Sequence, residues 1–190
     1  NDSVNIANAS NNLALMDMDA GDTQQALKRF QQSLNHTTTD TLGRIYTLRN
    51  IALLYNRSGN MEASDKYMNQ ALQEAKASKD PKILQMVFYT EGTLAMADST
   101  TLDSAIIFFG KAIAISRRYK DVLAEIQALI NVGVVHRDAG RQELSRQVFQ
   151  KVVELPEKQQ FPFGAFYGQM GIATSYLEDK DFEKAQQAIQ

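Results

Sequence analysis

The sequence predicts an all-α fold built from repeated pairs of antiparallel helices, and three observations support it. A small residue, followed four positions later by a large apolar one, recurs with spacings of 38, 41, 40 and 40 residues. A fixed period near 40 is typical of repeat architectures. Apolar residues recur with the helical period, and the alternation that indicates strands is nowhere sustained. The small residues are Ala26, Ser64, Ala105, Ser145 and Ala185, and the large ones are Phe30, Met68, Phe109, Phe149 and Ile189.

The first two repeats, residues 3–40 and 41–79, each read as helix, glycine turn and helix. In the segment YTLRNIALLY the apolar residues form one helical stripe, and a second stripe follows in ASDKYMNQAL. Gly21 and Gly59 separate the helices, because glycine accepts the positive φ that often ends a helix. We expect the small residue to let the paired helices approach closely and the large residue to fill the space beside them.

The remaining repeats, 80–119, 120–159 and 160–190, follow the same plan with local changes. Asp80 before Pro81 predicts an N-cap and a helix start. Pro156 indicates that a helix ends before it. Gly140 keeps the turn of the fourth repeat, whereas Thr100 and Lys180 replace glycine in the third and fifth, and the fifth repeat is truncated. In total, ten helices of about 14 to 18 residues are expected.

The deepest core positions follow from the same alignment. Phe30, Phe109 and Phe149 stand one helical turn after the small residue, so we expect them to be buried between helices. The glycines of GAFYGQMG, at 164, 168 and 171, do not form a dinucleotide motif and indicate close helix contact instead.

Composition limits the classes of function. The net charge is −2 and the basic residues do not cluster, which argues against nucleic-acid contact by this segment. The absence of cysteine removes disulfides, thiolate nucleophiles and cysteine-ligated metals. No apolar run approaches the roughly 18 residues needed to span a membrane. The compartment is not assigned by the sequence, and both cytoplasm and bacterial periplasm stay open.

Segments that could carry chemistry have simpler explanations. DMDAGD resembles the start of a calcium loop, but the required sixth glycine is Asp22 and the twelfth residue is Lys28, so Asp22 is expected to cap a helix. The two histidines, His36 and His136, lie 100 residues apart. His136 occupies a core position of the repeat, where a packed, hydrogen-bonded ring is expected. We therefore expect no metal, no cofactor and no enzymatic activity.

The motifs of the repeats resemble the tetratricopeptide repeat family. NNLALMDMDAGDTQQALKRFQQSL and GIATSYLEDKDFEKAQQAI carry its pattern well, and NIALLYNRSGNMEASDKYMNQAL has Ser64 in place of alanine. NVGVVHRDAGRQELSRQVFQKVV has His136 where tyrosine is expected, and GTLAMADSTTLDSAIIFFGKAI departs most. The resemblance implies that residues 1–190 form one right-handed superhelical solenoid. First helices would line a concave face that binds proteins or peptides.

The resemblance also places candidate groove residues. In some family members asparagines of the first helices bind the backbone of an extended peptide, and here the equivalent positions are Asn12, Asn50, Glu91, Asn131 and Gly171. Alternatively, asparagine is simply common at this repeat position. The other inward candidates are Arg49, Arg57 and Arg137, mixed with acidic residues, and the basic clamp of chaperone-tail-binding relatives is not reproduced.

Two surfaces remain open to more than one interpretation. The aromatic residues of FPFGAFYG belong either to the core between repeats or to an exposed platform for a partner. The fifth repeat has no following helix to cover it, so Tyr176 and Ile189 are expected to be exposed, and a homodimer could form there.

The functional hypothesis is a non-catalytic module that binds a protein or an extended peptide on the concave face. On the resemblance alone, it would be the sensor or scaffold part of a larger bacterial signalling or regulatory protein. The alternative is a homo-oligomerising structural element, and an enzyme is a remote third possibility.

Overall fold

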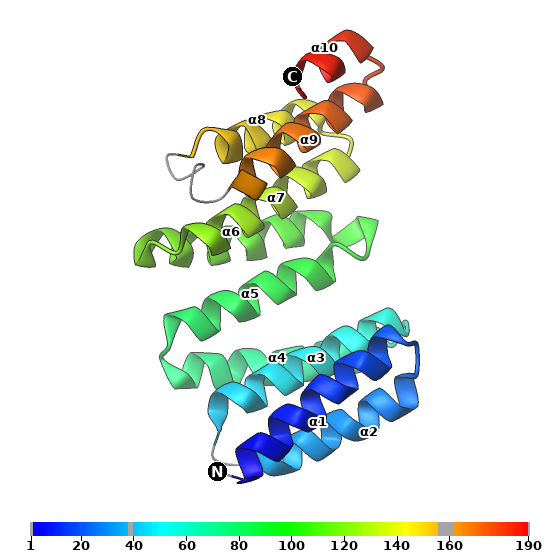
Figure 1. Cartoon of the computed structure of the whole chain (residues 1–190), viewed down its shortest axis with the longest axis vertical. Helices are drawn as coiled ribbons and strands as arrows, with labels where there is room; N and C mark the ends of the chain where they lie inside the picture. The colour runs from blue at the N-terminus through cyan, green and yellow to red at the C-terminus, as the bar shows by residue number, and fades with distance from the viewer. Residues whose placement is uncertain (1, 38–39, 156–161, 190) are drawn as a thin grey trace. The chain divides into compact units, whose positions relative to one another are not determined.

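The structure is a computed structural model that describes residues 2–37, 40–155 and 162–189 of the chain. Within these ranges it contains ten α-helices, one short 3₁₀ helix and no strand (Figure 1), which confirms the predicted all-α class. The elements are α1 (Asp2–Asp19), α2 (Thr23–His36), α3 (Thr41–Arg57), α4 (Met61–Ser78), α5 (Pro81–Ala95), η1 (Ser99–Thr101), α6 (Leu102–Tyr119), α7 (Val122–Asp138), α8 (Gln142–Val153), α9 (Pro162–Glu178) and α10 (Phe182–Gln187). Two helices are shorter than expected: α8 has 12 residues and α10 has 6.

The chain divides into two compact units, residues 1–87 and 88–190, with the boundary inside α5. In unit 1 the helices pack in hairpins, α1 on α2 and α3 on α4, and α1 also contacts α3. In unit 2 each helix from α6 to α10 packs on the next, and α7 also contacts α9. First helices of neighbouring repeats therefore lie side by side within each unit, as a repeat of hairpins requires.

The glycine turns have the predicted conformation. Gly21, Gly59 and Gly140 adopt φ values of 81°, 79° and 72°. A side chain added at any of them would meet no atom within 4 Å, so the backbone conformation, not space, requires glycine. Lys180 adopts the same left-handed conformation with φ of 61°. The third turn is built differently, because the Asp98 carboxylate accepts a hydrogen bond from the Thr100 backbone N–H at 2.8 Å.

Short polar residues cap most of the helix starts. The Asp22 side chain accepts a hydrogen bond from the Gln25 N–H at 3.0 Å, which confirms its interpretation as an N-cap. Asp80 accepts from the Lys82 N–H at 2.8 Å, as its place before Pro81 predicts. Four further helices start in the same way, with Asp40, Asn60, Asp121 and Asp181 as caps.

The predicted core residues are buried. Phe30 and Phe109 are fully buried, and Phe149 is 1% exposed. Phe149 lies against Gly133 of α7 and Gly171 of α9, where an added Cβ would come within 2.7 and 2.5 Å of its ring. A Cβ at Gly168 would lie 2.7 Å from Val153 of α8. The glycines of α9 therefore permit close helix contact, as predicted.

Serine at the small position adds a hydrogen bond to the hairpin. The Ser64 hydroxyl donates to the Ala52 carbonyl at 2.9 Å, and the Ser145 hydroxyl donates to the Gly133 carbonyl at 2.8 Å. Both bonds join the second helix of a repeat to its first helix, twelve residues earlier. A small hydroxyl therefore replaces alanine here without leaving a buried donor unpaired.

Candidate functional site

Residues of three first helices line a small groove in unit 2, which we call the first-helix groove. Its cavity has a volume of about 210 Å³. Residues of α5, α7 and α9 line it: Tyr89, Gln127, Ile130, Asn131, Phe163 and Tyr167.

Helical spacing explains why these side chains converge. Gln127, Ile130 and Asn131 are three and four residues apart on α7, and Phe163 and Tyr167 are four apart on α9. Residues at such spacings share one face of a helix. Because α7 and α9 pack side by side, the two faces border the same hollow.

Tyr89 and Asn131 form a fixed polar pair in the groove. The Asn131 Nδ2 donates a hydrogen bond to the Tyr89 hydroxyl at 2.9 Å. The Tyr89 ring packs edge-on against the buried Phe109, with ring centroids 5.5 Å apart. The hydroxyl keeps its own proton for donation, and the Asn131 carbonyl oxygen can still accept. The pair is therefore oriented in advance and can bond a peptide group.

The groove is lined by uncharged side chains, both apolar and polar. None of its six lining side chains is charged. Aromatic and aliphatic surface lies beside amide and phenol groups, which both donate and accept hydrogen bonds.

The predicted asparagines have different surroundings in the structure. Asn131 lines the groove. Asn50 is only 2% exposed, and its amide donates to Asn11 at 3.1 Å and accepts from Arg49 at 3.2 Å. Asn12 is exposed. Binding of a peptide by an asparagine ladder stays a prediction, and Asn50 would have to exchange internal hydrogen bonds to take part.

The three predicted arginines have different surroundings. Arg49 is half-buried over the Tyr46 ring, 5.2 Å from its centroid. Burial lowers the pKa of Arg49, and the nearby Tyr46 opposes this shift. Arg57 pairs with Asp19 at 3.4 Å, and Arg137 pairs with Asp138 at 3.0 Å and with Glu178 at 3.6 Å. Arg57 and Arg137 therefore already form ion pairs with acidic neighbours.

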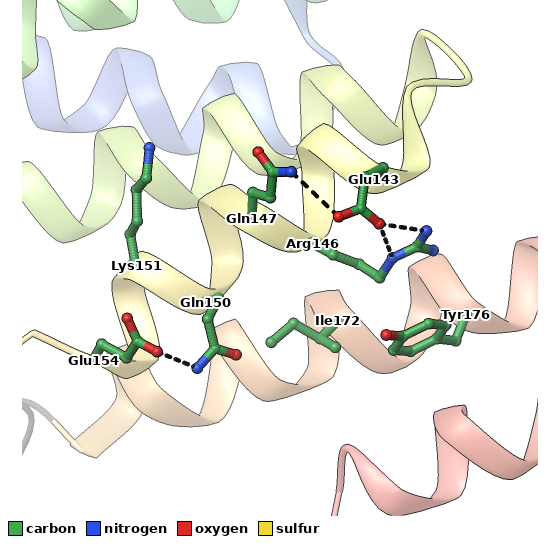
Figure 2. Close-up of a pocket in the computed structure, with 8 residues that line it drawn as sticks. All are labelled: Glu143, Arg146, Gln147, Gln150, Lys151, Glu154, Ile172 and Tyr176. Atoms are coloured by element: carbon green, nitrogen blue, oxygen red, sulfur yellow. Dashed lines mark hydrogen bonds and ion pairs between the residues drawn. The ribbon is translucent and has the colours of Figure 1, made fainter.

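A second hollow, the outer groove, lies between α8 and α9 and has a volume of about 430 Å³. Figure 2 shows the polar stripe of α8 facing Ile172 and Tyr176 of α9. The stripe consists of Glu143, Arg146, Gln147, Gln150, Lys151 and Glu154. Sequence reasoning missed this groove, although the spacing of three and four residues along α8 is a helical stripe.

Arg146 is the centre of the outer groove. Its guanidinium forms ion pairs with Glu143, at 3.1 Å, and with Asp179. It also stacks on the Tyr176 ring, 4.5 Å from the ring centroid. Burial by itself lowers the pKa of Arg146, but hydrogen bonds to Asp179 and Glu143 raise it above the ordinary value. Hydrogen bonds from Gln147 and Arg146 lower the pKa of Glu143. Ion pairs within the chain thus hold the Arg146 guanidinium in this groove.

The exposed apolar surface of the fifth repeat is only partly as predicted. Residues of α9 and α10 with Ile189 border an apolar hollow of about 310 Å³, and Phe182 and Ile189 are 67% and 57% exposed. The prediction for Ile189 is confirmed. The prediction for Tyr176 is wrong, because its ring is half-buried and lies between the cations of Arg146 and Lys184. We call the surface of Met170, Leu177, Phe182 and Ile189 the apolar end.

Three aromatic residues of α9 lie toward the surface. Phe166 and Tyr167 are 57% and 52% exposed and pack edge-to-face, with centroids 5.5 Å apart. Phe161 lies outside the described residues. Phe163 is described as well and is 37% exposed, so the three described rings favour the interpretation as an exposed platform over burial in the core.

His136 is half-buried, but its Nδ1 has no hydrogen-bond partner among the described residues. The predicted hydrogen-bonded ring is thus wrong at this nitrogen. Burial lowers the pKa of His136, and the cation of Arg141 lowers it further, whereas Asp103 opposes them. In the described part of the chain, no group of histidine, aspartate and glutamate side chains is placed to hold a metal ion.

No described helix is both long and apolar enough to cross a membrane.

Comparison with known proteins agrees with the repeat pattern. Residues 5–80 match the family model of the tetratricopeptide repeat. The chain is similar to the structure of nearly identical TPR-like repeats assigned to a kinesin light chain of Podosopora anserina. The TM-score is 0.76 at 13% identity, over 96% of this chain and 90% of that one. A search of curated proteins found no match.

Two further solved structures have the same fold. The structure of pilF from Pseudomonas aeruginosa has a TM-score of 0.68 at 15% identity, covering 99% of this chain and 75% of that one. BtubC (BKLC) from P. vanneervenii has a TM-score of 0.74 at 16% identity, covering 93% of this chain and 74% of that one. At such low identities the similarity concerns the fold alone. It confirms the predicted fold class of stacked helix hairpins.

Proposed function

We propose that this chain is a tetratricopeptide-repeat protein and that it is a non-catalytic module that binds a protein or an extended peptide on the faces of its first helices. The fold generally serves protein–protein interaction. The observation that carries the proposal is the first-helix groove, in which three first helices present hydrogen-bonding amides and phenols beside aromatic surface.

The size of the groove favours part of a large ligand over a whole small one. Pockets for small molecules usually measure about 300–1,000 Å³, and this cavity measures about 210 Å³. Such a hollow suits one anchored side chain of a longer segment. The Tyr89–Asn131 pair would then bond the backbone next to that side chain.

A peptide-display selection on the purified chain tests the proposal. We expect enrichment of peptides whose binding weakens about tenfold on Asn131→Ala, the loss of one good hydrogen bond. Asn12→Ala tests whether the exposed asparagine of the first repeat contributes as well. If no peptide or protein partner is enriched, or if the chain turns over a substrate, the proposal fails.

A second candidate function is homo-oligomerisation, which the apolar end favours. Exposed apolar surface of this kind marks interaction sites in many proteins. Light scattering over a range of concentrations should then show a dimer that Phe182→Asp dissociates. A monomer at every concentration would remove this candidate.

The finer proposal, a sensor or scaffold segment of a larger bacterial signalling or regulatory protein, rests on the family resemblance alone. The reading frame that surrounds this sequence tests it. A signalling or DNA-binding output domain in that frame would support it, and its absence would end it.

A further inference from the structure

We infer that the first-helix groove selects an uncharged segment of its partner, anchored by an aromatic or large aliphatic side chain. The inference rests on the proposed function and names the chemistry of the ligand for the same groove. It follows from the charge, the shape and the polar groups of the lining.

The lining offers no counter-ion to a charged side chain. Its six residues are uncharged. Several cations of the same unit are engaged outside the groove: Lys111 lies over the Phe88 and Phe108 rings at 5.3 and 5.0 Å, and Arg137 pairs with acidic residues. A carboxylate or an ammonium group that entered the groove would lose water and gain no ion pair, which is unfavourable. The lining therefore disfavours charged anchors, acidic ones most, because a cation could still stack on the aromatic rings.

The walls suit a ring or a branched aliphatic group. Tyr89 and Tyr167 contribute aromatic rings from α5 and α9, and Ile130 contributes aliphatic surface from α7. Aromatic rings in contact prefer edge-to-face or offset arrangements, as Tyr89 already adopts with Phe109. Because Phe109 is fully buried, it holds the Tyr89 ring in place before the ligand arrives.

The polar side of the groove limits the rest of the ligand. The Asn131 carbonyl oxygen and the Tyr89 hydroxyl proton point to no other described partner, and the Gln127 amide stands one helical turn away on the same face. These groups match the N–H and C=O of an extended backbone. The groove thus combines one apolar anchor with recognition of the neighbouring peptide groups.

The experiment is a selection of random twelve-residue peptides on the whole chain, followed by affinity measurements on the best peptide. We expect phenylalanine, tyrosine, tryptophan or leucine at an anchor position, with acidic and basic residues depleted there. Replacing the anchor with aspartate should weaken binding at least tenfold. Gln127→Lys should bring a cation into the groove. The ratio of the affinity of the best peptide to that of its aspartate variant should then fall at least fivefold.

A matched control makes the result specific to the groove. Gln150→Lys adds the same charge in the outer groove and should leave the preference unchanged. Melting temperatures of both variants show whether they are folded. If bound peptides carry charged anchors, or if Gln127→Lys and Gln150→Lys act alike, the inference is overturned while the proposed function stands. If no peptide binds at all, the proposed function fails and the inference fails with it.

Discussion

At the scale of single residues, the position of a side chain in the repeat decides how much it contributes to the stability of the fold. Phe109 is fully buried, and Gly92 of α5 lies so close that an added Cβ would come within 2.7 Å of its ring. Phe182 belongs to the same residue type but is 67% exposed. The same chemical change should therefore have very different effects at the two positions.

We expect Phe109→Ala to lower the free energy of unfolding by roughly 3–5 kcal/mol, because it removes buried apolar surface and leaves a cavity. Phe182→Ala should lower it by less than about 1 kcal/mol, as for most exposed positions. Urea unfolding followed by circular dichroism measures both. Equal effects would show that the helix register around α6 is wrong.

His136 should make stability depend on pH. The folded chain holds the pKa of His136 below its ordinary value, mainly through burial. Below about pH 6.5 the unfolded chain therefore binds a proton that the folded chain resists, so stability falls as the pH falls through this range. The fall ends once the pH is below the lowered pKa of the folded state.

The test compares the wild type with His136→Gln at pH 7.5, 6.5 and 5.5 by urea unfolding. The wild type should lose more stability than the variant between the upper and the lower pH. His36 is present in both proteins, so the difference reports His136 alone. Parallel curves would mean that protonation of His136 is not coupled to folding.

At the scale of helices and turns, the sequence predicts local geometry well because the causes are local. The positive φ at Gly140 and the cap at Asp80 each depend on a few neighbouring residues. The Tyr89–Asn131 bond joins residues 42 apart, and no periodic pattern marks it. The prediction that Tyr176 is exposed was wrong for a similar reason: Arg146 and Lys184, from two other helices, lie over its ring. Asn131 was predicted as a groove residue, and an exposed platform was one of two interpretations of the aromatics of α9, but Tyr89 was not predicted.

Two glycines test the local argument directly. Gly140→Ala should destabilise the chain by about 1 kcal/mol, because alanine resists the positive φ of this turn. Gly110 lies inside α6, and an added Cβ there would meet nothing within 4 Å. Gly110→Ala should therefore stabilise the chain by roughly 0.5–1 kcal/mol. Thermal unfolding of both variants gives the sign of each change in stability. If both variants were stabilised, or both destabilised, the assignment of the turn would be contradicted.

At the scale of the whole molecule, the chain is divided into two compact units, and the repeat period does not reveal this level of organisation. The period runs evenly through residues 80–119, yet the boundary falls inside α5, between residues 87 and 88. In repeat arrays each unit is stabilised mainly by its neighbours, so stability can be distributed unevenly along the chain. Each unit has its own buried phenylalanines, Phe30 in the first and Phe149 in the second.

A change in one core should therefore be felt first in its own unit. Native-state hydrogen exchange reports local protection. Phe30→Ala should speed exchange in α1–α4 more than in α6–α9, because the lost contacts lie in the core of unit 1. Phe149→Ala is the matched control and should do the reverse, since its ring packs between α7 and α9. If either substitution lowers protection equally from α1 to α9, the chain unfolds as a single cooperative body, and the two units have no separate stability.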